Sequence, residues 1–171
     1  MNDLIKKAKQ GDADAFVALM EQQKQSMYKV ARSYLHREED IADVIQDTIL
    51  DCFEKIGQLK NNHFFSTWLI RILINNCKDL LRAEKKEMPI ETFLEQGETC
   101  RELFQCEFEE LMNNMDEKYR VILTLYYSEG FKIREIAQIL DMDENTVKTR
   151  LARGRRQFAN LYQMEPAVER R

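Results

Sequence analysis

Apolar residues recur every three or four positions along most of the chain, which is the spacing of amphipathic α-helices. No segment shows the sustained apolar and polar alternation that is typical of a strand. The pattern predicts an all-α protein with helices over about 13–35, 38–57, 66–85, 107–114, 117–129, 132–140 and 144–162. With 5 glycines and 2 prolines in 171 residues, the chain lacks the turn residues that an all-β fold needs.

The formal net charge of −4 hides an uneven distribution of charge along the chain. Residues 1–86 carry a net charge of +1 and residues 87–117 carry −9, whereas residues 118–143 are neutral and residues 144–171 carry +4. The acidity of the whole chain therefore comes from one internal stretch. It does not argue against a nucleic-acid partner for the basic C-terminal end.

The acidic stretch also divides the chain into two parts. It contains Pro89 and Gly97, and its first part has only weak helical periodicity. We therefore predict two small helical domains, residues 1–86 and 107–171, joined by an acidic linker at 87–106. A solvated acidic helix in place of the linker is the alternative, and neither form would bind a polyanion.

The last two predicted helices have the spacing of a helix-turn-helix. The first of them is short and amphipathic, with apolar positions at Ile133, Ile136, Ala137, Ile139 and Leu140. The connection is three residues long, and its last residue, Asp143, is a good N-cap for the second helix. Asp141 stands where such turns often have glycine, but aspartate tolerates the left-handed conformation better than most residues.

The second helix of this pair separates its apolar and basic residues on opposite faces. Val147, Leu151, Gly154 and Phe158 share the side that can pack on the preceding helices. The other side and its edge carry Asn145, Thr146, Lys148, Thr149, Ala152, Arg153 and Arg156. Residues 145–158 hold five Lys or Arg and no acid, so we favour DNA binding in the major groove over a merely solvated basic helix.

The helix at 66–85 has a broad apolar stripe and, opposite it, a face typical of single-stranded nucleic-acid binding. That face holds Trp68, Arg71, Asn75, Lys78 and Arg82. The preceding loop adds Lys60, Asn61, Asn62, His63, Phe64 and Phe65. Unpaired bases stack on aromatic rings while cations follow the backbone. An equally good interpretation of Trp68 is that it is a core residue at a helix junction.

The helix at 38–57 carries a candidate protein-binding patch opposite its buried side. An exposed leucine is ringed by acids and an amide: the set is Asp43, Gln46, Asp47, Leu50 and Glu54. One exposed leucine is normal in any protein, so this signal is weak when it is taken alone.

Several classes of function are excluded by what the sequence lacks. No nucleophile motif, phosphate-binding loop or zinc-ligand spacing occurs, so we expect no catalytic residues, no metal and no cofactor. No apolar run approaches the roughly 20 residues that cross a bilayer, and no secretory signal is visible. We expect a cytoplasmic protein without membrane insertion and with reduced thiols, although Cys100 and Cys106 could pair.

Four segments in this order resemble bacterial RNA polymerase sigma factors of the extracytoplasmic-function (ECF) type. They are AKQGDADAF, EEDIADVIQDTIL, FSTWLIRILINNCKDLLR and REIAQILDMDENTVKTRLARGRRQF. No single segment is decisive, but their order, their spacing and the acidic linker between them make the resemblance strong. It covers nearly the whole chain and implies a two-domain, non-catalytic specificity subunit of RNA polymerase, serving stress or cell-envelope genes.

The resemblance also implies a role for each candidate surface. The patch around Leu50 would dock on the clamp helices of the polymerase β′ subunit. The loop 60–65 and the outer face of 66–85 would capture the unwound −10 strand. Helix 144–158 would enter the major groove of the −35 element, where Lys148, Thr149, Ala152 and Arg153 match the DNA-facing positions of the family.

The resemblance implies partners beyond the promoter. The linker would thread through core polymerase, which includes the β subunit, near the active site and the RNA exit path. A membrane-bound anti-sigma factor would dock at the apolar seams between the two domains.

Two other interpretations compete with this one. An ordinary helix-turn-helix regulator would bind duplex DNA alone and would not need residues 38–85 for promoter opening. A helical adaptor or regulator of another sigma factor would leave the basic face of 145–158 unexplained.

Overall fold

The computed structural model describes residues 1–87, 108 and 110–164, and this part of the chain is helical without a strand. The α-helices are α1 (Asn2–Lys9), α2 (Ala13–Arg32), α3 (Glu38–Lys55), α4 (Phe65–Glu87), α6 (Glu117–Leu123), α7 (Ile133–Leu140) and α8 (Glu144–Met164). Short 3-10 turns, η1 (Ile56–Gln58) and η2 (Asn62–Phe64), precede α4, and a π-helical turn, η3 (Thr124–Ser128), follows α6. The predicted all-α class is confirmed, whereas the linker predicted at 87–106 lies, apart from Glu87, outside the described residues.

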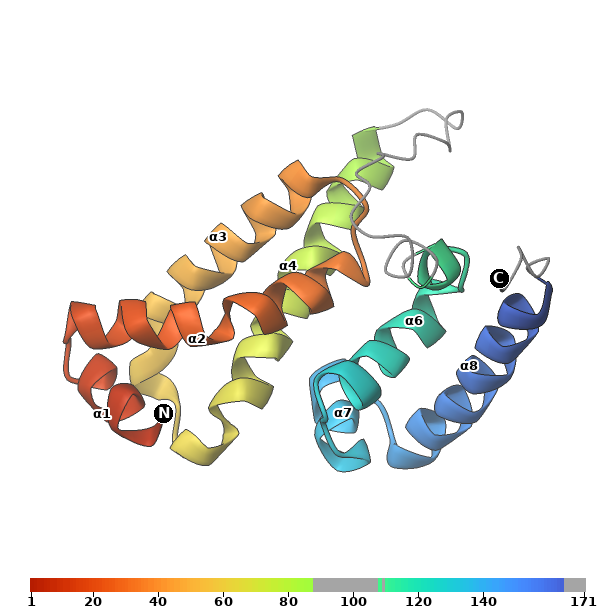
Figure 1. Ribbon diagram of the computed structural model, residues 1–171. Coiled ribbons are helices and arrows are strands. Elements are labelled where there is room, and N and C mark those ends of the chain that lie inside the picture. The colour runs from red at the N-terminus through yellow and green to blue at the C-terminus, as the bar shows by residue number, and fades with distance from the viewer. Residues whose placement is uncertain (88–107, 109, 165–171) are drawn as a thin grey trace, which may run out of the picture.

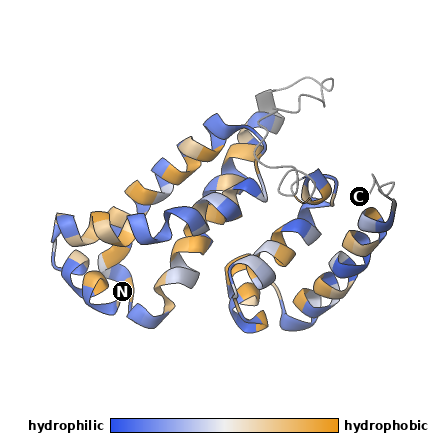
Figure 2. Cartoon of the chain, viewed as in Figure 1, coloured by the Kyte–Doolittle hydropathy of each residue, from blue (hydrophilic) through white to orange (hydrophobic). Residues whose placement is uncertain are grey.

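Helices α1 to α4 form the N-terminal half around one apolar core. Asp12 caps the N-terminus of α2, since its carboxylate accepts a hydrogen bond of 2.9 Å from the amide of Ala15. The largest completely buried side chains include Leu19, Met27, Leu69, Ile70, Leu73 and Ile74. Figure 2 shows that hydrophobic and hydrophilic residues are interleaved along these helices, which leaves the outer faces polar.

Helix α1 was not predicted, because its apolar stripe is only two turns long. Ile5 and Ala8 are buried, and Leu4 packs against the same core. The chain then reverses at Gly11, whose φ of 91° lies in the region that favours glycine. The reversal folds α1 back on α2 and beside η2.

Helices α6 to α8 form the C-terminal half and include the predicted helix-turn-helix. Asp141 takes the left-handed conformation, with φ 54° and ψ 55°, at the end of α7. Asp143 caps α8 by accepting a hydrogen bond of 2.8 Å from the amide of Thr146. The helix predicted over 117–129 is instead α6 followed by η3, because hydrogen bonding widens to a π-turn at Thr124.

The two halves touch along α2 and α4, as Figure 1 shows. Helix α7 packs on α4, and the guanidinium of Arg120 in α6 donates a hydrogen bond of 2.8 Å to the carbonyl of Ser33 at the end of α2. The carboxylate of Glu129 accepts a hydrogen bond from Ser26 and lies 3.7 Å from the ammonium of Lys29. Apolar side chains of both halves thus join in one continuous core, with polar contacts at its margin.

Candidate nucleic-acid interface

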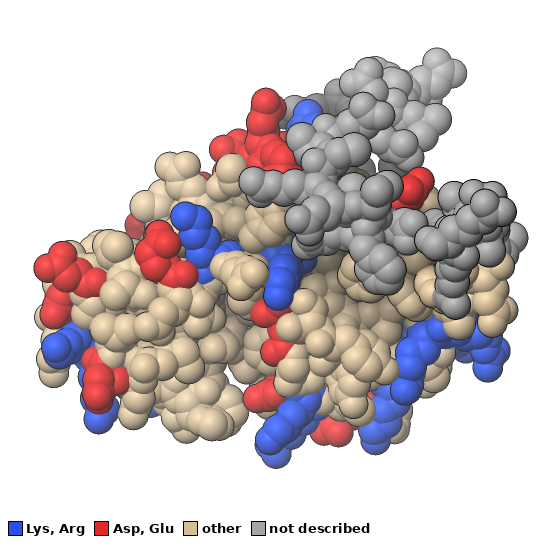
Figure 3. Space-filling view, in the orientation of Figure 1, with Lys and Arg blue, Asp and Glu red and all other residues tan. Residues whose placement is uncertain are grey.

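The outer face of α8 is basic and exposed, whereas its inner face is buried. Val147 and Leu151 are 0% and 2% exposed. The predicted DNA-facing residues are exposed at Asn145, Lys148, Thr149, Ala152, Arg153 and Arg156 and half-buried at Thr146. Within the described part of the chain, no carboxylate pairs with the five cations of residues 145–158. Figure 3 shows Lys and Arg gathered over α8, so this face is free to meet phosphates.

Close packing and a cap position this face. A Cβ added at Gly154 would lie 3.2 Å from the Cβ of Tyr119, so α8 approaches α6 closely and a side chain at this position would require Tyr119 to shift. The hydroxyl of Thr146 donates to the carboxylate of Asp143. Hydrogen bonds from Thr146 lower the pKa of Asp143, because they stabilise its ionised form. Thr146 is thus part of the cap as well as an edge residue of the predicted DNA face.

The loop before α4 divides its residues between inward and outward roles. The side-chain oxygen of Asn61 accepts a hydrogen bond of 2.9 Å from the amide of His63. The side chain of Asn62 is held by Asn2 at 3.1 Å and by the ammonium of Lys9 at 3.3 Å. Both amide side chains therefore hold the shape of the loop.

The exposed groups that remain in this loop are Lys60, His63 and Phe64. The ring of Phe64 is 44% exposed and meets the ring of His63 edge to face, with centroids 5.4 Å apart. Phe65, which follows, is completely buried and anchors the start of α4. An aromatic pair on a rigid anchor is a suitable platform for an unpaired base.

The outer face of α4 continues from this loop. Arg71, Asn75 and Arg82 are exposed, and Lys78 is half-buried. Arg82 pairs with Asp79 at 2.9 Å, but both side chains are about 70% exposed, so this ion pair contributes little. Trp68 is half-buried beside Phe65, with ring centroids 6.1 Å apart, so it packs against the core and still presents part of its ring to solvent.

The outer face of α3 carries the candidate protein-binding patch. Asp43, Gln46, Asp47, Leu50 and Glu54 are all exposed, as the helical spacing predicts. Phe53, which the sequence interpretation missed, is 58% exposed beside Leu50 at 57%. Its position three residues after Leu50 was an available signal. An apolar groove of about 680 Å³ between α2 and α3, lined by Ile45 and Ile49 among others, borders this patch.

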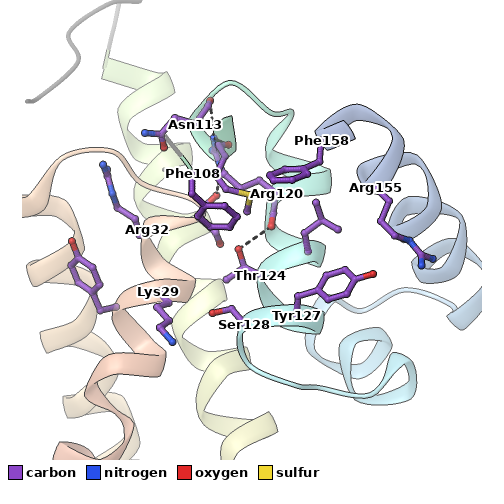
Figure 4. A pocket seen from close by; sticks show the side chains of 14 residues that line it. Lys29, Arg32, Phe108, Asn113, Arg120, Thr124, Tyr127, Ser128, Arg155 and Phe158 are labelled. Carbon is purple, nitrogen blue, oxygen red and sulfur yellow. Dashed lines mark hydrogen bonds between the residues drawn. The ribbon is translucent and has the colours of Figure 1, made fainter. Parts of the chain in front are cut away.

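A second cavity of about 650 Å³ lies between the two halves of the protein. Figure 4 shows Lys29 and Arg32 on its α2 side and the rings of Phe108, Tyr127 and Phe158 around the C-terminal half. The centroids of the Phe108 and Phe158 rings are 5.9 Å apart. The cavity therefore combines aromatic walls with the cations Lys29 and Arg32 on the α2 side and Arg155 on α8.

Arg120 is buried at the base of this cavity. Its guanidinium donates hydrogen bonds to the carbonyls of Ser33, Met112 and Asn113 at 2.8, 3.4 and 3.2 Å. Burial lowers the pKa of Arg120, although the neighbouring Glu117 partly offsets this effect. The three carbonyls, one from the N-terminal half and two from the C-terminal half, thus take the place of water around the guanidinium of Arg120.

Neither a metal centre nor a reactive thiol is found in the residues that the structure describes. No group of three or more His, Cys, Asp or Glu there could hold a metal ion. Cys52 and Cys77 are free and buried, and burial raises the pKa of each thiol to about 12. Cys100 and Cys106 lie outside the described residues. No helix of the described chain is long and apolar enough to cross a membrane.

Comparison with known proteins identifies the family. Residues 19–87 match the family described as Sigma-70 region 2, and residues 107–158 match Sigma-70, region 4. RNA polymerase sigma factor SigV of Bacillus subtilis (strain 168) is 31% identical over 152 residues, which cover 86% of this chain and 91% of SigV. The chain belongs to the sigma-70 family of RNA polymerase sigma factors.

Further similarity places this sigma factor in the ECF group. The ECF RNA polymerase sigma-E factor of Haemophilus influenzae is 28% identical over 178 residues, which cover 94% of each chain. The fold resembles that of the sigma factor RpoE in complex with the anti-sigma factor NepR from Bartonella quintana, with a TM-score of 0.74. That structure shares 20% identity and covers 88% of this chain and 98% of RpoE, so it supports the fold alone.

Membership assigns this protein its activity. A sigma factor binds core RNA polymerase and promoter DNA and directs transcription initiation, as a specificity subunit without catalytic residues. The first matched segment begins within α2 and extends through α4, and the second contains the helix-turn-helix. Helix α1 lies before both segments.

Proposed function

We propose that the two halves of this sigma factor recognise different promoter elements. Residues 107–171 bind the −35 element as a duplex, and residues 1–86 bind core polymerase and the unwound −10 strand. The observation that carries this proposal is the division of α8 into a buried apolar face and an exposed face with Lys148, Arg153 and Arg156, in a stretch, 145–158, that holds five cations and no acid. Small and long residues are mixed on that face, which allows both close approach and reach to base edges.

The −35 site consists of the exposed face of α8 with the edge residue Thr146. Lys148, Arg153 and Arg156 are suited to reach bases or phosphates, since all three are long, charged and exposed. Ala152 and Thr149 are small enough to let the helix enter the groove.

The −10 site consists of the loop and the outer face of α4. Phe64 and Trp68 are suited to stack unpaired bases, and Arg71, Lys78 and Arg82 to follow the backbone. Lys60 and Asn75 extend the same exposed surface. Asn61 and Asn62 support the loop from within, because their side chains are already bonded to the protein.

The patch on α3 is the proposed contact with the clamp helices of the β′ subunit. It presents Leu50 and Phe53 within a rim of Asp43, Gln46, Asp47 and Glu54. An apolar centre with a polar rim is the usual composition of a protein–protein interface. We expect the β subunit of core polymerase to contact this protein elsewhere in the holoenzyme.

Transcription with a library of promoters tests the proposal as a whole. Core polymerase is incubated with and without this protein on templates whose upstream region is randomised. We expect transcripts only with the protein, from templates that share two separated sequence elements. Transcripts that share a single element, or none, would contradict the proposed division.

Matched variants test each half separately. Arg153→Ala should weaken −35 duplex binding by about 1–3 kcal/mol if the guanidinium reads a base. Lys118→Ala removes one exposed charge from α6 and serves as the control.

Asp47→Ala should weaken association with core polymerase and leave duplex binding unchanged. A change only in duplex affinity for Asp47→Ala would show that the α3 patch has another role.

The cavity between the halves is the proposed docking site of an anti-sigma factor that is anchored in the membrane. The protein itself would then be cytoplasmic, serving stress or cell-envelope genes on release. Support comes from the aromatic walls and the cations Lys29 and Arg32, which suit an amphipathic acidic segment. The similar fold of RpoE, solved in complex with the anti-sigma factor NepR, is in keeping with this proposal.

Neighbouring tyrosines provide the test. Tyr127 lines the cavity, whereas Tyr126 does not, and both are exposed. Tyr127→Glu should turn on the regulated genes without the inducing stress, because an added carboxylate repels an acidic segment. Tyr126→Glu should keep them repressed. Equal behaviour of the two variants would place the inhibitor elsewhere.

A further inference from the structure

Helix α1 lies against the loop that the proposed function assigns to the −10 strand. The ammonium of Lys9 donates a hydrogen bond of 2.6 Å to the carbonyl of Leu59 and one of 3.3 Å to the side-chain oxygen of Asn62. The side chain of Asn62 donates in turn to that of Asn2, at 3.1 Å. Both ends of this short helix thus hold the same loop.

Helix α1 is anchored to the protein by apolar packing and by hydrogen bonds at the turn that follows it. Ile5 and Ala8 are 1% and 7% exposed, so the helix is anchored by its apolar side. At the turn, the amides of Gly11 and Asp12 donate to the carbonyls of Ala8 and Lys7, at 3.0 and 3.1 Å. A loop that is bonded to an anchored helix loses less conformational entropy when it binds a ligand.

The half-buried Lys9 differs from its neighbours Lys6 and Lys7, which are exposed. A surface lysine near DNA would contribute to binding by neutralising a phosphate. Lys9 directs its ammonium into the protein instead, toward a backbone carbonyl and an amide oxygen. Its charge therefore strengthens two hydrogen bonds that fix the loop.

We propose that α1 braces the −10 loop and that Lys9 is a positioning residue for recognition of the −10 strand. This inference rests on the proposed function of the loop. In this arrangement Asn61 and Asn62 keep the backbone in shape, while His63 and Phe64 stay exposed to meet a base. Without the brace, His63 and Phe64 would still be present, but the loop would no longer hold them in one arrangement.

The test compares two single-stranded DNA probes bound to the holoenzyme. One probe is selected from a randomised pool by the wild-type holoenzyme, and the other is the unselected pool. Lys9→Met should weaken binding of the selected probe by about tenfold, because the loop loses both hydrogen bonds from the ammonium and must be ordered when the strand binds. Binding of the unselected pool, the salt dependence and the association with core polymerase should not change.

Two matched variants and a second measurement complete the experiment. Lys9→Arg should restore most of the affinity, because a guanidinium can donate to the same oxygens. Lys7→Met should leave discrimination between the probes unchanged. Amide hydrogen exchange should become faster at residues 60–64 in Lys9→Met, while α3 and the C-terminal half of α4 keep their protection.

Three results would overturn the inference. Equal weakening for both probes with a salt slope lower by about one would make Lys9 a phosphate contact. Unchanged affinity for the selected probe would mean that the brace does not matter for binding. If Lys9→Arg restored normal hydrogen exchange at residues 60–64 but did not restore affinity, the brace would likewise not matter for binding. Failure of the proposed function would look different, since Phe64→Ala would then bind the selected probe as tightly as the wild type does.

Discussion

The two halves of this sigma factor differ in the amount of apolar core that supports their binding faces. In the N-terminal half, four helices surround a continuous set of completely buried side chains, with Ile70, Leu73 and Ile74 at its centre. The C-terminal half has two short helices, α6 and α7, and the longer α8, and its packing includes the close contact at Gly154 and the contact of α7 with α4. The N-terminal half thus holds most of the completely buried side chains, and the C-terminal half packs partly against it.

The largest expected effect concerns this asymmetry. Leu73→Ala should destabilise the protein by about 3 kcal/mol through lost contacts and a cavity. Because α7 packs on α4, hydrogen-exchange protection should fall in both halves. Ile136→Ala, in the buried face of α7, should reduce protection mainly in the C-terminal half. Equal loss of protection in both halves for both variants would mean that the halves depend on each other equally.

The next effect concerns the polar contact between the halves. Arg120→Met leaves three carbonyls without their buried donor and should lower stability by about 2 kcal/mol. Small-angle scattering should show a larger radius of gyration, because the Ser33 contact is lost. Arg134→Met, which changes an exposed arginine of α7, is the control. An unchanged radius for Arg120→Met would show that the apolar contact between α4 and α7 is sufficient.

A smaller effect concerns the close approach of α8 and α6. Gly154→Val should cost about 1.5 kcal/mol, since the Cβ of Tyr119 lies too near for a branched side chain and is fixed by its backbone. The shift of α8 should also weaken −35 duplex binding. Asn160→Val places the same side chain at an exposed position of α8 and controls for helix propensity. Similar affinities for the two variants would indicate that α8 tolerates displacement.

The smallest effect concerns the cap of α8 and its dependence on pH. The pKa of Asp143 is lowered in the folded protein, so its contribution to stability is present above its unfolded value, about 3.9. That contribution is lost as the pH falls through the lower, folded value. Asp143→Asn keeps a capping oxygen without this titration, so circular dichroism should show a smaller acid loss of helix than in wild type. Identical acid transitions in wild type and Asp143→Asn would show that ionisation of Asp143 does not stabilise α8.

Much of the fold was predictable because helical periodicity and capping are local properties. The helix-turn-helix followed from apolar spacing, and both Asp141 and Asp143 take the conformations expected from their chemistry. The faces of α3 and α8 were also assigned correctly as exposed. Helix α1 was missed because two apolar turns give a weak periodic signal, although its buried Ile5 is as well packed as the core.

The candidate −10 site was predicted only in part. The exposure of Phe64 and Arg71 agrees with the pattern, but Trp68 lies between the two interpretations that the sequence left open. The side chain of Asn61 is engaged locally by the amide of His63, whereas that of Asn62 is engaged by Lys9 and Asn2, which the fold brings beside the loop. No spacing in the sequence indicates a contact across more than fifty residues.

The sequence by itself determined the helices, their buried and exposed faces, and the concentration of positive charge on α8. These features depend on residues that are close along the chain, where backbone geometry relates spacing to position. Only the tertiary structure decided that Arg120 joins the halves, that α1 supports the −10 loop and that Gly154 sets the distance between α8 and α6. Such contacts depend on how separate helices approach each other, and many sequences with the same local pattern would pack differently.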